Sequence, residues 1–255
     1  MNLISAKSLS IRLGNKSICD GLDLDIDTGQ RWGVLGRNGI GKTTLLKYLA
    51  GLLSDFTGSI SLKDTSINEW KRKDLAREIG VLFQDSQDTF PTTVIETALI
   101  GRHPYLPFWS FEGNEDLDIA TRALADVALT GMENRQINTL SGGERRRLAI
   151  ASLLVQKPRI WLLDEPTNHL DLHHQITLLK VILDYVDTAE GALFMVLHDV
   201  NLVTRFCSHA MLMVDAGTIL TGTVQEVVTQ DNLTLMYGHP VHHIQVDGNS
   251  YFFPE

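Results

Sequence analysis

Cysteine is scarce in this sequence. Cys19 and Cys207 are the only two among 255 residues, and they lie far apart. Neither belongs to a C-x-x-C pair or to a His/Cys spacing that would indicate a metal site. We therefore expect reduced structural thiols rather than a disulfide or a bound metal.

Long apolar runs and an excess of positive charge are also missing. The apolar stretches 149–155 and 160–163 are far shorter than the roughly 18 to 20 residues that cross a bilayer. The chain starts with polar residues and without a signal-peptide core, so by default we expect a cytosolic protein. The net charge of −9 argues against a nucleic-acid partner, because such a partner needs a basic face.

What the sequence does contain is a complete phosphate-binding motif. Residues 36–44 match G-x-x-x-x-G-K-[ST] and lie between an apolar run, expected to be a buried strand, and an apolar helical stretch. The glycines allow a tight turn whose N–H groups face phosphates at a helix N-terminus. Lys42 supplies charge to the β- and γ-phosphates, and the Thr43 hydroxyl suits Mg²⁺. The predicted nucleotide-binding residues are Gly36, Arg37, Asn38, Gly39, Gly41, Lys42, Thr43 and Thr44.

The spacing of apolar residues predicts an α/β fold. Segments 3–10 and 21–27 alternate as antiparallel strands do, and the charged segment 68–78 is predicted to be a helix. Helical patterns dominate 93–155, after which strands and helices alternate as in a mostly parallel sheet covered by helices. We expect one domain: a catalytic core with an antiparallel N-terminal β-subdomain (1–90 and 157–238), an inserted α-helical subdomain (91–156) and a C-terminal hairpin (239–255).

An apolar strand at 160–163 leads into Asp164 and Glu165. Ligands of open parallel sheets bind beyond the carboxyl ends of the strands, where these two acids are expected. Asp164 suits ligation of Mg²⁺, and Glu165 is placed to orient or deprotonate an attacking water.

Residues 140–144 form a second loop of small residues at the start of a helix. No strand precedes this loop, so it is not a second copy of the first motif; we expect Ser141, Gly142, Gly143 and Glu144 to act on the nucleotide of another subunit. The same residues also match a capping box, with Ser141 as N-cap and Glu144 at N3. The two interpretations are compatible.

Through these motifs the chain resembles an ATP-binding cassette (ABC) ATPase, a P-loop NTPase, over essentially its whole length. Six motifs stand in the family's order: the Walker A loop at 36–44, the Q-loop Gln84, the signature at 140–144, Walker B at 160–164 with Glu165, the D-loop at 168–171, and the switch His198. The resemblance implies ATP and Mg²⁺ as cofactors. It implies catalytic roles for Glu165, His198 and Gln84, and it implies Thr43, Gln84 and Asp164 as metal ligands.

The resemblance also implies a head-to-tail homodimer with two ATP molecules between Walker A of one subunit and the signature of the other. Ser141 and Gly143 would touch the partner's γ-phosphate, and Asp171 would link the two sites. A finer resemblance, carried by 96–104, 197–202 and 232–238, is to importers of iron-siderophores, haem, vitamin B12 and some oxyanions. It implies integral-membrane permease subunits, a periplasmic or extracellular substrate-binding protein, and a peripheral location on the cytoplasmic face of the inner membrane.

Two positions depart from the family. Where many members stack adenine on an aromatic ring, this chain has Ile11 and Leu13, and where Gln is common after the signature it has Arg146. The first implies weaker adenine binding unless another group replaces the ring, and the second implies an altered contact to the partner's ribose.

Several alternatives are open on the sequence alone. A single-cassette ATPase of iron-sulfur cluster assembly is one, although the Gly101-Arg102-His103-Pro104 stretch favours transport. Arg102 is either part of that mark or only a charge at a helix C-terminus. The aromatic segment 105–111 is either a partner surface or part of a small core. His239, His242 and His243 fit a polar hairpin edge better than a metal site, and His173 and His174 are expected to be exposed.

Overall fold

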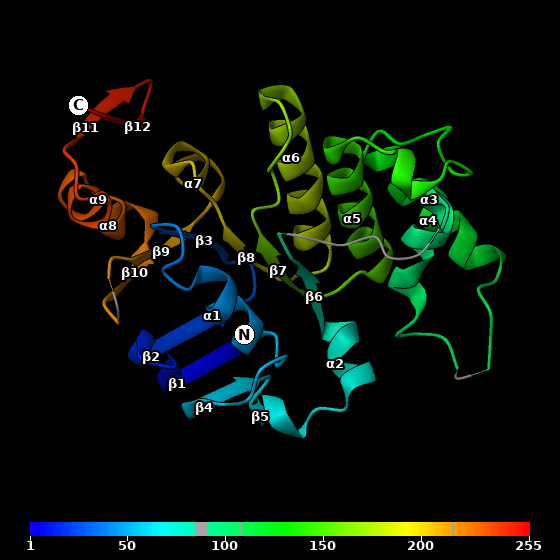
Figure 1. Cartoon of the computed structure of the whole chain (residues 1–255), viewed down its shortest axis with the longest axis horizontal. Helices are drawn as coiled ribbons and strands as arrows, with labels where there is room; N and C mark the ends of the chain where they lie inside the picture. Colours follow the sequence, from blue (N-terminus) through cyan, green and yellow to red (C-terminus); the bar gives the residue numbers. More distant parts are fainter. Residues whose placement is uncertain (85–90, 108, 216) are drawn as a thin grey trace. The chain divides into compact units, whose positions relative to one another are not determined.

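The computed structural model describes residues 1–84, 91–107, 109–215 and 217–255. The chain divides into two units (Figure 1). The first unit comprises Met1–Trp70, Leu162–Asp164 and Ala192–Glu255; the second comprises Lys71–Trp161 and Glu165–Gly191.

The first unit contains an antiparallel sheet at the N-terminus. Its strand order is β2-β1-β4-β5, with bounds Lys16–Asp27, Asn2–Leu13, Thr57–Leu62 and Thr65–Ser66. Buried and exposed residues alternate along β2, as the sequence pattern predicts for a strand with one face in the core. The antiparallel subdomain is therefore confirmed.

A second sheet of this unit carries the parallel strands. β3 (Arg31–Gly36) runs parallel to both β8 (Ala192–Val196) and β9 (His209–Met213). The sheet continues from β8 to β7 (Ile160–Asp164), and β10 (Ile219–Thr223) pairs antiparallel with β9 at the other edge. Every residue of β7 and β8 is buried, which is typical of parallel strands covered on both faces.

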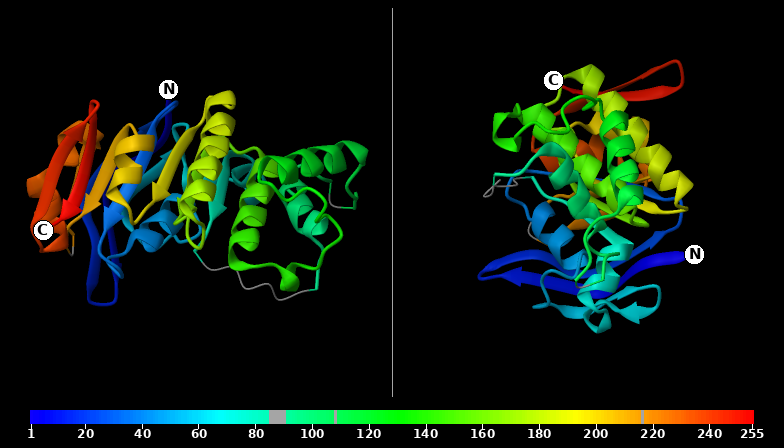
Figure 2. Two further views of the ribbon diagram at one scale, coloured as in Figure 1. Left: turned by 90° about the horizontal axis from the view of Figure 1, so that it is seen from above. Right: turned by 90° about the vertical axis from the view of Figure 1, so that its right-hand side faces the viewer.

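Helices and a hairpin complete the first unit. The helices are α1 (Lys42–Leu49), α7 (Val200–Phe206), α8 (Val224–Val227) and α9 (Gln230–Tyr237), with a 3₁₀ turn at Ile67–Glu69. Figures 1 and 2 show α1 between the antiparallel sheet and β3. The hairpin of β11 (Val241–Val246) and β12 (Asn249–Pro254) confirms the predicted C-terminal turn, and Asn201 of α7 exchanges two hydrogen bonds with the Phe252 backbone.

The second unit is largely helical. It contains α2 (Arg72–Glu78), β6 (Ile79–Leu82), α3 (Val94–Leu99), α4 (Asn114–Asp126), α5 (Gly142–Gln156) and α6 (Leu172–Thr188), with 3₁₀ turns at Ile100–Arg102 and Ile137–Thr139. The predicted helix 68–78 is wrong in its first part, because Trp70 and Lys71 are extended and α2 begins at Arg72.

The turn after α3 lies against α5. A side chain at Gly101 would clash with the carbonyl oxygen of Ser152, so only glycine allows this close approach. Arg102 pairs with Asp116 at 2.6 Å and lies over the Tyr105 ring, with 4.3 Å from the guanidinium carbon to the ring centre. Arg102 therefore packs against neighbouring side chains and is not only a charge at a helix end.

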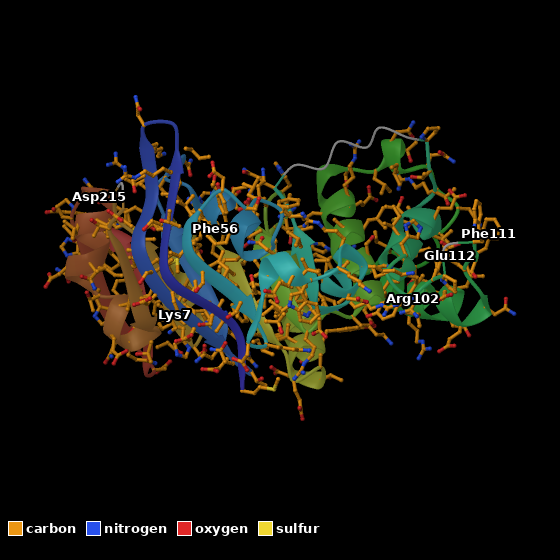
Figure 3. All side chains as sticks on the ribbon, turned by 90° about the horizontal axis from the view of Figure 1, so that it is seen from below. Lys7, Phe56, Arg102, Phe111, Glu112 and Asp215 are labelled. Carbon is orange, nitrogen blue, oxygen red and sulfur yellow. The ribbon has the colours of Figure 1, made fainter. Side chains whose placement is uncertain are left out.

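The aromatic segment 105–111 has two kinds of member. The Tyr105 hydroxyl donates to the carbonyl of Gln156 on α5, so this residue belongs to the packed helices. Trp109 and Phe111 are 89% and 91% exposed, and Figure 3 shows Phe111 at the outer edge of the unit near Glu112. Phe108 lies outside the described residues. The interpretation that all these rings form a core is therefore wrong for Trp109 and Phe111.

The remaining sequence expectations concern thiols, histidines and membrane spans. Cys19 and Cys207 are free, and burial raises the pKa of the Cys19 thiol to about 11. His242 and His243 lie beside Phe253 and Phe252, and over the four described ranges no three His, Cys, Asp or Glu side chains gather into a metal site. Within those same ranges, no helix has both the length and the apolar character of a bilayer span.

Candidate functional site

The phosphate loop connects β3 to α1 in the first unit. Gly39 and Gly41 have φ of 72° and 127°, conformations that favour glycine. A Cβ at Gly41 would lie 2.6 Å from Cδ1 of Ile18, so a side chain there would also collide with the strand below the loop. The backbone geometry therefore requires the glycine that the motif prescribes at position 41.

Lys42 is folded into this loop. Its side chain is 7% exposed, and its Nζ donates to the carbonyls of Gly36 at 2.7 Å and Arg37 at 3.2 Å. The ammonium group is thus held over the turn, where a phosphate would meet it. Lys16, the first residue of β2, donates to the carbonyl of Gly39; this contact was missed because Lys16 belongs to no motif.

Thr43 and Asp164 meet at the end of the loop. The Thr43 hydroxyl donates to Oδ2 of Asp164 at 2.5 Å, and Asp164 is fully buried. A hydroxyl and a buried carboxylate side by side form a hard oxygen pair of the kind that Mg²⁺ uses in nucleotide sites, so the residues present fit this ion.

Three strand ends of the first unit share one edge of the sheet. The phosphate loop follows β3, His198 follows β8, and Asp164 ends β7, with β8 between the other two strands. The N–H of Leu197 donates to the carbonyl of Val34 at 3.1 Å, which ties the residue before His198 to β3. His198 is exposed, as a ligand-facing side chain must be. Within this unit the phosphate loop, Asp164 and His198 therefore lie at one edge of the sheet, the edge at which ligands of open parallel sheets bind.

Glu165 and Gln84 belong to the second unit. Glu165 is 6% exposed and has a φ of 52°, a left-handed conformation that is strained for a residue other than glycine. Its carboxylate accepts a hydrogen bond from the amide of Asn168, a contact that sequence reasoning did not find. Gln84 is exposed and follows β6 by two residues.

The signature residues form the start of α5. Ser141 and Glu144 form a capping box: the Ser141 hydroxyl accepts from the N–H of Glu144 at 3.3 Å, and the Glu144 carboxylate accepts from the N–H of Ser141 at 2.7 Å. The second bond, with Arg135 nearby, holds the pKa of Glu144 below its ordinary value. The capping interpretation is confirmed, and it leaves Gly142 and Gly143 at the N-terminus of the helix.

The D-loop lies directly against these glycines. A Cβ at Gly143 would be 3.2 Å from the carbonyl oxygen of His169, a tight contact that the D-loop could accommodate only by shifting slightly. Signature and D-loop together line a pocket of about 430 Å³ that includes Ser141, Gly142, Gly143 and Asp171.

Asp171 caps α6 and contacts His174. The Asp171 carboxylate accepts from the N–H of His174 at 2.9 Å, and Nδ1 of His174 lies 2.9 Å from both carboxylate oxygens. These contacts hold the pKa of Asp171 below its ordinary value, the backbone bond contributing most. His174 is therefore not simply exposed, as expected from sequence. Gln175 fastens the same loop by donating to the carbonyls of Thr167 and Leu170.

The positions that depart from the family pattern differ in how they are placed in the structure. Ile11 is fully buried in the antiparallel sheet and has no free face for adenine, whereas Leu13 is 47% exposed. Arg146 is 7% exposed, and its guanidinium donates to backbone carbonyls of its own unit. The guanidinium therefore points into its own unit, and the altered contact to a partner's ribose stays a prediction.

Comparisons with known proteins agree with these motifs. Residues 19–168 match the protein family described as ABC transporter. The hemin import ATP-binding protein of Escherichia coli is 36% identical over 243 residues, 92% of each chain. The petrobactin import ATP-binding protein of Bacillus anthracis is 36% identical over 227 residues, 89% of this chain and 83% of its own length. A solved inward-facing ABC transporter described as metal-chelate type has a TM-score of 0.86 at 26% identity, covering 100% of this chain and 98% of its own.

Proposed function

Because this chain belongs to the ABC transporter family, we propose that it is the ATPase subunit of an importer for an iron-siderophore, haem, cobalamin, or a related metal chelate or oxyanion. The observation that carries the proposal is the likeness to a hemin import ATP-binding protein over 92% of both chains. A role in iron-sulfur cluster assembly is not favoured, because the relatives matched are named as subunits of importers or transport systems.

The residues around the phosphate loop support ATP binding. Lys42 and the loop N–H groups would bind the phosphates, and His198 would donate a hydrogen bond to the γ-phosphate. Thr43 and Asp164, with Gln84 by family resemblance, would hold Mg²⁺. When bound, this ion would neutralise phosphate charge. Glu165, with its carboxylate held by Asn168, would orient and deprotonate the attacking water.

The second half of each nucleotide site would come from another copy of the chain. The pocket between signature and D-loop presents small residues and a helix N-terminus, which suits a phosphate. In the proposed head-to-tail homodimer, Ser141 and Gly143 contact the partner's γ-phosphate and Asp171 links the two sites. The dimer would attach to permease subunits at the cytoplasmic face of the membrane, and a separate substrate-binding protein would deliver the cargo.

Substitution of the proposed base tests catalysis. Glu165→Gln keeps the phosphate loop intact but removes the proton acceptor, so we expect kcat to fall by about 100-fold or more while ATP affinity is retained. ATP-bound dimers should accumulate on a sizing column. Glu115→Gln, an exposed carboxylate on α4, is the matched control and should hydrolyse ATP normally. Near-normal turnover by Glu165→Gln would remove Glu165 from the catalytic role.

The metal assignment is tested at Thr43. Thr43→Val removes the hydroxyl but keeps the side-chain volume, so ATP binding in Mg²⁺ should weaken by about 10-fold, whereas binding in EDTA should not change. Thr43→Ser retains the hydroxyl and should behave like the parent protein. Equal weakening with and without Mg²⁺ would show that Thr43 does not act through the ion.

The exposed rings of the segment 105–111 are proposed to contact the permease. Because Trp109 is 89% exposed, Trp109→Ala should change the free energy of unfolding by less than about 0.5 kcal/mol and should leave ATP binding intact. Co-purification with the permease subunits should weaken, since large exposed aromatic side chains often anchor interfaces. Tyr105→Ala, which removes a packed residue, should instead lower stability. Normal assembly of a stable Trp109→Ala protein would contradict the docking role.

A further inference from the structure

Arg146 is a buried arginine in the second turn of α5. A guanidinium cannot lose its charge and carries five N–H donors, so burial is tolerated only where these donors find acceptors. Its Nη1 donates to the carbonyl of Phe83 at 2.7 Å, Nη2 to that of Glu165 at 2.5 Å, and Nε to that of Pro166 at 3.3 Å. All of these residues belong to the second unit.

The three carbonyls belong to two functional segments. One carbonyl belongs to Phe83, which directly precedes Gln84. The other two belong to Glu165, the proposed base, and to Pro166, which follows it. Glu165 is in the left-handed conformation, which is unfavourable for a residue other than glycine and persists only where the surroundings enforce it. A charge-assisted hydrogen bond to its own carbonyl is such an enforcing contact.

We propose that Arg146 is a positioning residue for ATP hydrolysis. From α5, the helix that begins with the signature, it fixes the backbone of Glu165 and of Phe83, the residue before Gln84. The guanidinium links α5 by hydrogen bonds to the residue before Gln84 and to the backbone of Glu165 and Pro166. Its contribution is to kcat, because its hydrogen bonds go to the backbone of the groups that are proposed to act on water, and not to the phosphate loop. This inference rests on the proposed ATPase function and adds a residue to it.

Lysine is the informative replacement. Arg146→Lys keeps the charge and most of the stem, but an ammonium is a compact group that cannot reach three carbonyls arranged around a planar fork. Arg146→Met keeps the stem and removes every donor. A matched control is Arg159→Lys, because Arg159 also donates to a backbone carbonyl, that of Glu190, and immediately precedes β7, at the end of the strand opposite Asp164.

The experiment measures steady-state ATP hydrolysis per folded molecule, together with ATP affinity, for the chain alone and with its permease. We expect Arg146→Lys to lower kcat by about 10- to 100-fold while KM and ATP affinity stay within about threefold of the parent values. Hydrogen exchange at the amides of Gln84 and Thr167 should become faster. Arg159→Lys should match the parent protein in each readout.

The outcomes separate the inference from the function on which it rests. An unchanged kcat in folded Arg146→Lys, or a change in KM alone, would overturn the positioning role while leaving the ATPase assignment intact. Absence of hydrolysis by the parent protein in both settings would overturn the proposed function itself. If Arg146→Met fails to fold, the lysine variant still decides the question, because its activity is normalised to folded protein.

Discussion

The hydrogen bond between Thr43 and Asp164 is the contact on which the proposed nucleotide site depends. It joins the first turn of α1 to the carboxyl end of β7, residues separated by 121 positions in the chain. A fully buried carboxylate is costly to desolvate and is stable only with donors or a cation beside it. The site thus uses buried charge to fix the position of the phosphate loop, and the sheet order places His198 at the same edge.

In the second unit, side chains hold the functional loops by donating hydrogen bonds to their backbone carbonyls. Gln175 bonds the carbonyls of Thr167 and Leu170 in the D-loop, and Arg146 bonds those of Phe83, Glu165 and Pro166. Glu165 is the proposed base and Asp171 the proposed link between the two sites, and Asn168 and His174 hold their carboxylates. The contacts of Gln175 and Arg146 go to backbone carbonyls, so they impose geometry without using the functional side chains themselves.

Features encoded by local pattern could be predicted from the sequence. The phosphate loop, the acids after an apolar strand, the capping box at Ser141 and the C-terminal turn each depend on a few neighbouring residue types. The start of the helix predicted over 68–78 was wrong, because the extended backbone at Trp70 and Lys71 leaves no mark in periodicity. The contacts of Arg146 could not be foreseen, because its acceptors are backbone carbonyls 19 to 63 residues away, and every residue type has one.

The central claim is that each nucleotide site combines the phosphate loop of one chain with the signature of another. The most direct measurement compares the ATPase activity of two purified heterodimers: Lys42→Ala paired with Ser141→Arg, and the parent chain paired with a chain carrying both substitutions. With shared sites, the first heterodimer has one intact site and should retain about half the parent activity, whereas the second has a lesion in each site and should be inactive. The reverse ranking, with activity only in the heterodimer that contains a parent chain, would show that each chain works on its own nucleotide and would contradict the account.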